Sequence, residues 1–222
     1  MKKQSLIIIF LILTAGIYAQ TDKDQLALNV ARAEDENIAK LKDYIWKRTS
    51  NVFIDSELKL TTVTEFKFDA DGKLETTMVD AQTTVKKKHG LRGVAQKNAA
   101  ENKEEYVQQA LELASHYAFL SKGELVDFFD KAAITEKDGL IEATASNVHL
   151  NGDRLTLRID PVTNLIVYKE FSSLLGKDLI DGQLNYDKFS NGTVHGTTTS
   201  LNLPVEKMKI EALNHDYTVR VQ

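Results

Sequence analysis

The 222-residue sequence has no cysteine and only two prolines. Without cysteine, the chain has no disulfide framework, no thiolate zinc site, no iron–sulfur cluster and no cysteine nucleophile. A chain of this length buries roughly 70% of the surface that it exposes when unfolded, so it does not need such cross-links to fold. With 42% hydrophobic and 27% charged residues, the composition is that of a folded protein.

The sequence also lacks the local motifs of several common enzymes. It has no nucleophile elbow and no P-loop. Asp69–Gly72 resembles the start of a calcium loop without the later ligands, and it fits a hairpin turn better. No two histidines have the spacing that places two metal ligands on one helix face; they are His89, His116, His149, His195 and His215. We therefore predict no catalytic residues, no metal and no cofactor. The weaker alternative is a hydrolase with two carboxylates paired across a cleft.

The first nineteen residues have the three parts of a secretory signal peptide. Lys2 and Lys3 precede an unbroken apolar run over Leu6–Leu13, and the small residue Ala19 ends the segment. The apolar run is shorter than the about 20 residues of a membrane span, although a retained anchor is the alternative. We predict cleavage near Ala19. Residues 20–222 would then form one mature domain that is periplasmic or secreted and does not span the membrane.

Positive charge is scarce in the predicted mature chain. The net charge is −4 for the whole sequence and −6 once the two lysines of the signal peptide are removed. A nucleic-acid-binding domain carries a basic patch or stripe, so we predict no nucleic-acid partner. One basic segment stands out, formed by Lys86, Lys87, Lys88 and Arg92. It is either a surface for an anionic membrane or a protein partner, or a solvated strand end leading into a helix.

Three stretches have the spacing of apolar residues that is typical of helices. The first spans about Asp24–Tyr44, and we expect its polar part, Glu34–Asn37, to face outward. The second spans about Ala99–Phe119. The third opens with Ser121–Glu124, which has the pattern of a capping box.

The remaining chain has the alternation of apolar and polar residues that is typical of strands. Short turns such as Asn151-Gly152 and Asp160–Asn164 separate them, so neighbouring strands must be antiparallel. About nine segments follow the pattern: one from about Tyr44, then Leu58–Phe68, Leu74–Gln82, Leu140–Leu150, Leu155–Ile159, Leu165–Ser172, Gln183–Phe189, Gly196–Leu203 and Lys207–Val221. We predict an α+β fold with one large, curved antiparallel sheet and helices against one face, two of them inserted after the third strand.

Three segments in this order resemble the LolA-like superfamily, which includes a periplasmic lipoprotein carrier, its receptor, and relatives that bind lipids or regulators. One segment runs from a helix directly into a strand over Glu36–Trp46. Another is the hairpin Leu155–Ile166, of the form L-x-L-x-I-D-P-x-T-x-L-I. The last is the final tract Leu203–Ile210.

The mature chain is similar in more detail to a set of uncharacterised secreted bacterial proteins. The shared motifs are Tyr44-x-Trp46, then Phe68–Lys73, then Lys87–Gly93 followed by a helical insert. The resemblance covers residues 24–222. These motifs belong to turns and strands, so they indicate the fold more directly than the function.

The resemblance implies an incomplete barrel that helices close as a lid over an apolar cavity for acyl chains. The residues that would line it are Trp46, Phe66, Phe68, Leu155, Leu157 and Ile159, with Phe128 and Phe129 on the lid. We do not locate the arginine with which LolA holds its lid, so lipoprotein shuttling is not carried over.

We therefore predict an exported, non-catalytic envelope protein that binds a lipid or the acyl chain of a lipoprotein. A site for such a ligand needs a concavity of about 300 Å³ or more. In the alternative, the same residues fill a solid core. The protein would then be an interaction or sensor module with an envelope protein as its partner.

Overall fold

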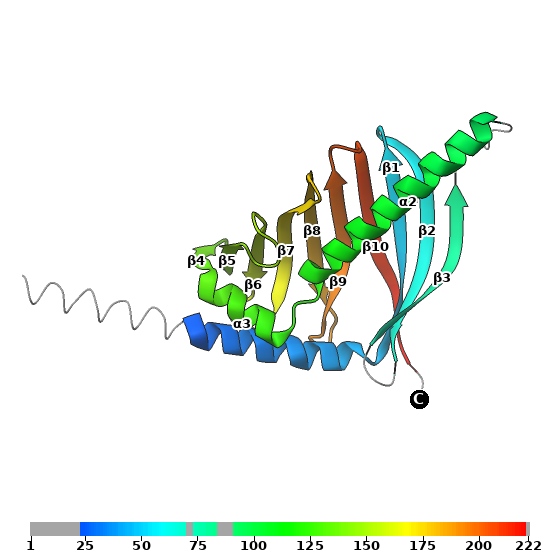
Figure 1. Ribbon diagram of the computed structural model, residues 1–222. Coiled ribbons are helices and arrows are strands. Elements are labelled where there is room, and N and C mark those ends of the chain that lie inside the picture. Colours follow the sequence, from blue (N-terminus) through cyan, green and yellow to red (C-terminus); the bar gives the residue numbers. More distant parts are fainter. Residues whose placement is uncertain (1–22, 70–72, 84–90, 221–222) are drawn as a thin grey trace, which may run out of the picture.

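The computed structural model describes residues 23–69, 73–83 and 91–220, with the backbone alone for 91–104. The predicted signal peptide and Lys86, Lys87 and Lys88 lie outside these residues and stay predictions. Within the described part, an N-terminal helix over residues 23–41 is followed by ten strands and two further helices (Figure 1). In chain order they are β1 (Tyr44–Ile54), β2 (Glu57–Phe68), β3 (Leu74–Thr83), α2 (Leu91–Ala118), α3 (Lys122–Lys131), β4 (Ala133–Lys137), β5 (Leu140–Ser146), β6 (Arg154–Ile159), β7 (Ile166–Leu175), β8 (Asp178–Lys188), β9 (Val194–Leu203) and β10 (Met208–Val219).

All ten strands form one antiparallel sheet in the order β3-β2-β1-β10-β9-β8-β7-β6-β5-β4. Pairing between β1 and β10 joins the first and the last strand of the chain, with Val52 opposite Ile210. The sheet does not close, because β3 and β4 are both edges. Figure 1 shows α2 crossing one face of the sheet, and the N-terminal helix running along the ends of several strands. The predicted α+β fold with an open antiparallel sheet and two inserted helices is confirmed.

The sheet has ten strands where about nine were predicted. The additional strand is β4, whose five residues follow directly after the C-cap of α3 at Ala132. Four of the five are exposed, so β4 lacks the alternation of buried and exposed residues by which the other strands are recognised. Helix α2 also begins earlier than predicted, at Leu91, and therefore includes the backbone of Arg92.

The capping box predicted for α3 is present. The Ser121 side chain accepts a hydrogen bond from the Glu124 backbone N–H at 3.3 Å, and the Glu124 carboxylate accepts one from the Ser121 N–H at 2.7 Å. The buried face of α3 consists of Leu125, Phe128 and Phe129. Because these side chains pack against the sheet, α3 covers the β4–β6 end of the molecule (Figure 1).

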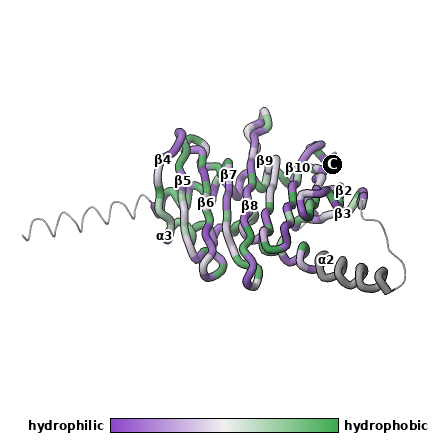
Figure 2. The backbone as a smooth tube through the Cα atoms, turned by 90° about the horizontal axis from the view of Figure 1, so that it is seen from above, coloured by the Kyte–Doolittle hydropathy of each residue, from purple (hydrophilic) through white to green (hydrophobic). Residues whose placement is uncertain are grey.

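Buried residues recur at every second position in parts of β5, β8, β9 and β10, which places them on one face of the sheet. Figure 2 shows the hydropathy of the residues along the chain. The buried side chains form two clusters. The larger lies between the sheet and the three helices and contains Phe128, Phe129, Leu155, Leu157 and Ile159. The smaller consists of Trp46, Phe66 and Phe68, with Leu41 at the end of the N-terminal helix packed against it.

No helix in the described part combines the length and the apolar content that a membrane crossing requires.

Candidate ligand cavity

A cavity of about 220 Å³ lies between the sheet, the N-terminal helix and the last two turns of α2. The sheet contributes residues from β1, β2 and β7–β10. The helices contribute apolar side chains that include Ile38, Leu41, Leu111 and Ala114, and the α2–α3 connection adds Phe119 and Leu120. Most of the wall is therefore apolar.

Two of the apolar side chains at the cavity remain accessible. Phe119 is 57% exposed and Leu111 is 42% exposed, although both line the cavity. Both lie on the α2 side, where the helix ends and the chain turns toward α3. Apolar side chains that are accessible at the edge of a concavity are typical of a place where an apolar ligand binds.

Aromatic rings form one end of the cavity. The Trp46 ring stacks on Phe66 and on Tyr217, each with centroids 5.6 Å apart, and lies tilted against Phe68 at 6.0 Å. Trp46, Phe68 and Tyr217 line the cavity, whereas Phe66 lies behind Trp46. The indole Nε1 of Trp46 is buried and has no hydrogen-bond partner among the described residues.

The structure brings together only part of the predicted cavity set. Trp46 and Phe68 line the cavity, and Phe66 contacts it through Trp46. The other five belong to the packed core and are not among the cavity residues; they are Phe128, Phe129, Leu155, Leu157 and Ile159. Of the predicted basic surface, Arg92 lies in the first turn of α2, and its side chain is outside the described part.

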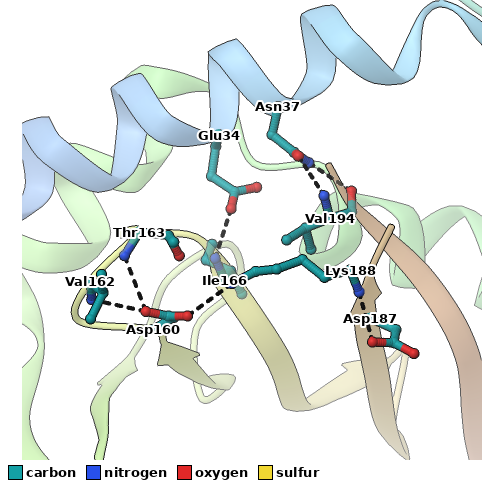
Figure 3. A network of polar contacts seen from close by, with 9 residues as sticks. All are labelled: Glu34, Asn37, Asp160, Val162, Thr163, Ile166, Asp187, Lys188 and Val194. Atoms are coloured by element: carbon teal, nitrogen blue, oxygen red, sulfur yellow. Dashed lines mark hydrogen bonds and ion pairs between the residues drawn. The ribbon is translucent and has the colours of Figure 1, made fainter. Parts of the chain in front are cut away.

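Polar side chains of the N-terminal helix dock it onto the sheet. Asn37 is 6% exposed and makes two hydrogen bonds with Val194: its Nδ2 donates to the backbone oxygen at 2.8 Å, and its Oδ1 accepts from the N–H at 2.7 Å (Figure 3). The Glu34 carboxylate accepts from the Ile166 N–H at 2.8 Å. The expectation that Glu34–Asn37 faces outward is therefore wrong for these two residues. They satisfy backbone groups at the starts of β7 and β9, while Asp35 and Glu36 are exposed.

The turn between β6 and β7 lies beside this docking site. Asp160 accepts hydrogen bonds from the backbone N–H groups of Val162 and Thr163 at 2.9 and 3.1 Å, and the Lys188 ammonium donates to it at 3.0 Å (Figure 3). These contacts keep the pKa of Asp160 below its usual value, although burial acts against them. The predicted turn therefore fixes where β7 begins, and with it the position of Ile166.

Lys169 is a buried cation that lines the cavity from β7. It is 4% exposed, its Nζ donates to the backbone oxygen of Ala118 at 2.6 Å, and it lies 5.8 Å from the centre of the Tyr186 ring. Burial lowers the pKa of Lys169, and the negative charge of Glu34 opposes that shift. Burial raises the pKa of Glu34, and Lys169 opposes that shift in turn. Lys169 thus holds the last residue of α2 against the sheet.

Arg48 is the second cation of the cavity wall. Its Nε donates to Asn214 Oδ1 at 2.7 Å, and its guanidinium lies 4.6 Å above the centre of the Phe66 ring. Burial lowers its pKa. Burial also raises the pKa of two nearby cavity phenols, Tyr186 and Tyr217, so both are neutral at physiological pH.

Sequence reasoning missed Arg48 and Lys169, although a signal for each existed. Arg48 has the same parity along β1 as Trp46, and Lys169 has the same parity along β7 as the buried Phe171. Since side chains of equal parity face the same side of a sheet, each cation is placed on the inner face by the alternation alone.

Comparisons with known proteins give structural likenesses only. No family model matches the chain, and no curated protein matches its sequence. It is similar to a DUF1329 family protein from Desulfovibrio piger, with 12% identity over 90% of this chain and 93% of that one, at a TM-score of 0.42. It is also similar to a LolA superfamily protein from Nitrosomonas europaea, with 12% identity over 88% of this chain and 94% of that one, at a TM-score of 0.40.

A third similar structure is an outer membrane lipoprotein-sorting protein domain from Vibrio parahaemolyticus, with 11% identity over 88% of this chain and 94% of that one, at a TM-score of 0.45. One of the three carries the name of the superfamily that the sequence resembles. At TM-scores below 0.5, these likenesses say nothing further about function.

Proposed function

We propose that this protein is an exported, non-catalytic binding protein whose cavity holds one acyl chain of a lipid or a similarly narrow apolar ligand. The observation that carries the proposal is the cavity between the sheet, the N-terminal helix and α2, with its aromatic end and its accessible apolar edge at Phe119. Export rests on the signal-peptide pattern of residues 1–19.

The size of the cavity narrows the class of ligand. At about 220 Å³ it is smaller than the about 300 Å³ expected from the sequence for a site that encloses a lipid, so the expectation of a cavity that holds a whole lipid is not met. This volume favours a single chain over a ligand with several chains. It also favours a ligand of which only one part is enclosed while the rest remains at the surface.

A cavity-filling variant tests the proposal. Ala114 lines the cavity from α2, so Ala114→Phe is expected to occupy the space that a ligand would use. Trp46 is the only tryptophan and lines the same cavity, so its fluorescence reports the occupancy directly. We expect decanol to change the Trp46 emission of the unmodified protein in a saturable way, and to leave that of Ala114→Phe unchanged.

The matched control is Ala39→Phe, which adds the same ring to an exposed position of the N-terminal helix. It should bind decanol as the unmodified protein does. Thermal melting of all three proteins checks that each is folded. Saturable decanol binding that is equal in Ala114→Phe and in the control would contradict the assignment of the ligand to this cavity.

A further inference from the structure

Arg48 is a cation in the cavity wall that no carboxylate compensates within the described part of the chain. None of its contacts there is an ion pair: Nε donates to the neutral amide of Asn214, and the guanidinium covers the Phe66 ring. The titratable groups that interact with it are the phenols of Tyr217 and Tyr186, and both are neutral at physiological pH. A guanidinium has five N–H donors, and the Asn214 contact uses only one of them.

The other basic side chains that line the cavity either have an opposing charge or are neutral. Lys169 has Glu34 as an opposing charge and donates to the Ala118 carbonyl. Burial lowers the pKa of His195, which stacks on Phe189 at 3.9 Å and is neutral at physiological pH. Arg48 is therefore the one described cation of the wall whose charge is left for something else to balance. Leaving a partly buried charge without a partner costs free energy.

A second donor without an acceptor belongs to Trp46, two residues before Arg48 on β1. Trp46 and Arg48 have the same parity on β1, and both contact the Phe66 ring, Trp46 by stacking and Arg48 from above. The buried indole Nε1 of Trp46 has no acceptor among the described residues. Both residues line the cavity, and the unused N–H groups of Arg48 in this largely apolar wall favour a ligand that carries acceptor oxygens at one end.

We infer that Arg48 binds the anionic head of the ligand. The ligand is then a single hydrocarbon chain that ends in a carboxylate, as in a fatty acid, or in a phosphate. This inference rests on the proposed function and adds the chemistry of the bound end. The planar guanidinium fork matches two oxygens of either head group, and the cavity around it supplies the apolar wall for the chain. Asn214 holds the fork in place through Nε, which leaves the remaining N–H groups for the anion.

The test compares ligands that share one chain and differ in the head. Decanoate, decanol, decylamine and monodecyl phosphate are titrated into the mature protein at pH 7.5, below their micelle concentrations, with calorimetry and Trp46 emission as readouts. We expect at least one of the two anions to bind roughly tenfold or more tighter than decanol, the factor expected of one charge-assisted hydrogen bond. Decylamine should bind more weakly than decanol. Decanoate and monodecyl phosphate together tell which head the site prefers.

Variants assign the preference to Arg48. The readout is the ratio of anion affinity to decanol affinity in each variant, because Arg48 lines the cavity and its loss can alter decanol binding too. Arg48→Gln should bring this ratio close to one, while Arg48→Lys, which keeps the charge, should retain part of the preference. Arg154→Gln removes an exposed arginine of β6 and should change nothing. Thermal melting identifies any variant that fails to fold. If Arg48→Gln does not fold, the anion preference of Arg48→Lys is compared with that of the unmodified protein instead.

Three outcomes would overturn the inference. The anions and decanol could bind the unmodified protein equally, Arg154→Gln could lower anion binding as much as Arg48→Gln does, or Lys169→Met could abolish the preference while Arg48→Gln keeps it. In each case the chain still binds, so the proposed function stands. If none of the four ligands binds, the proposed function itself fails.

Discussion

At the scale of single residues, a few buried polar side chains position the elements around the cavity. Asn37 replaces a missing strand neighbour for Val194, because its amide offers the same donor and acceptor as a backbone peptide group. Glu34 does the same for the Ile166 N–H with one oxygen. The N-terminal helix is thereby held at the strand ends by side chains that the sequence marks only as polar.

Asn37→Ala is expected to destabilise the protein by about 1–3 kcal/mol, because it leaves the N–H and the carbonyl of Val194 buried without partners. Urea denaturation of the mature protein measures the change. Glu36→Ala is the control, since Glu36 is exposed on the same helix. Equal loss of stability in both variants would mean that the amide does not dock the helix.

At the scale of elements, three polar contacts attach the C-terminal end of α2 to the rest of the fold. The Tyr117 hydroxyl donates to Asp153 at 2.7 Å and contacts Ser173 at 2.8 Å, and the ammonium of Lys169 donates to the carbonyl of Ala118. Asp153 also accepts from three backbone N–H groups of the β5–β6 connection, at 2.6–2.8 Å. One carboxylate thus fixes both a turn and the helix that borders the cavity.

Asp153 gives the stability a predictable pH dependence. Although burial raises its pKa, the hydrogen bonds to the carboxylate outweigh burial, and the pKa lies below 3.8. The stabilisation is therefore fully present above pH 3.8 and is lost as the pH falls through the folded-state pKa. Asp153→Asn should cost about 1.5–3 kcal/mol at pH 7, the range for hydrogen bonds to a charged group. Urea denaturation at pH 7 and at pH 3 should show this difference shrinking in acid, and a difference independent of pH would contradict the assignment.

The sequence predicted most elements, because alternation and turn chemistry are local. The Asn151-Gly152 turn lies between β5 and β6 as predicted, with Gly152 at a φ of 88° that favours glycine. The strand β4 was missed because its residues are exposed and show no period. The outward assignment was wrong for Glu34 and Asn37, because polar residues that satisfy a neighbouring element's backbone resemble solvated ones in sequence.

At the scale of the whole molecule, the curvature of the sheet and the crossing of α2 decide which apolar residues enclose space and which fill it. Trp46 and Phe68 border the cavity, whereas Leu155, Leu157 and Phe128 are in the packed core under α3. All of them are apolar and buried, so their sequence patterns are the same. The division between cavity and core depends on where two helices lie over a ten-stranded sheet, and no local pattern specifies that.

The most direct test of the binding proposal is to ask whether the protein already carries a ligand. The mature chain, residues 20–222, is purified from an envelope fraction without detergent and extracted with organic solvent, and the extract is examined by mass spectrometry. We expect a single-chain acyl species in stoichiometric amount, absent from Ala114→Phe and present in Ala39→Phe. Protein that is free of lipid, and that stays so after incubation with vesicles of phosphatidylglycerol and phosphatidylethanolamine, would contradict the proposed function and favour an interaction module instead.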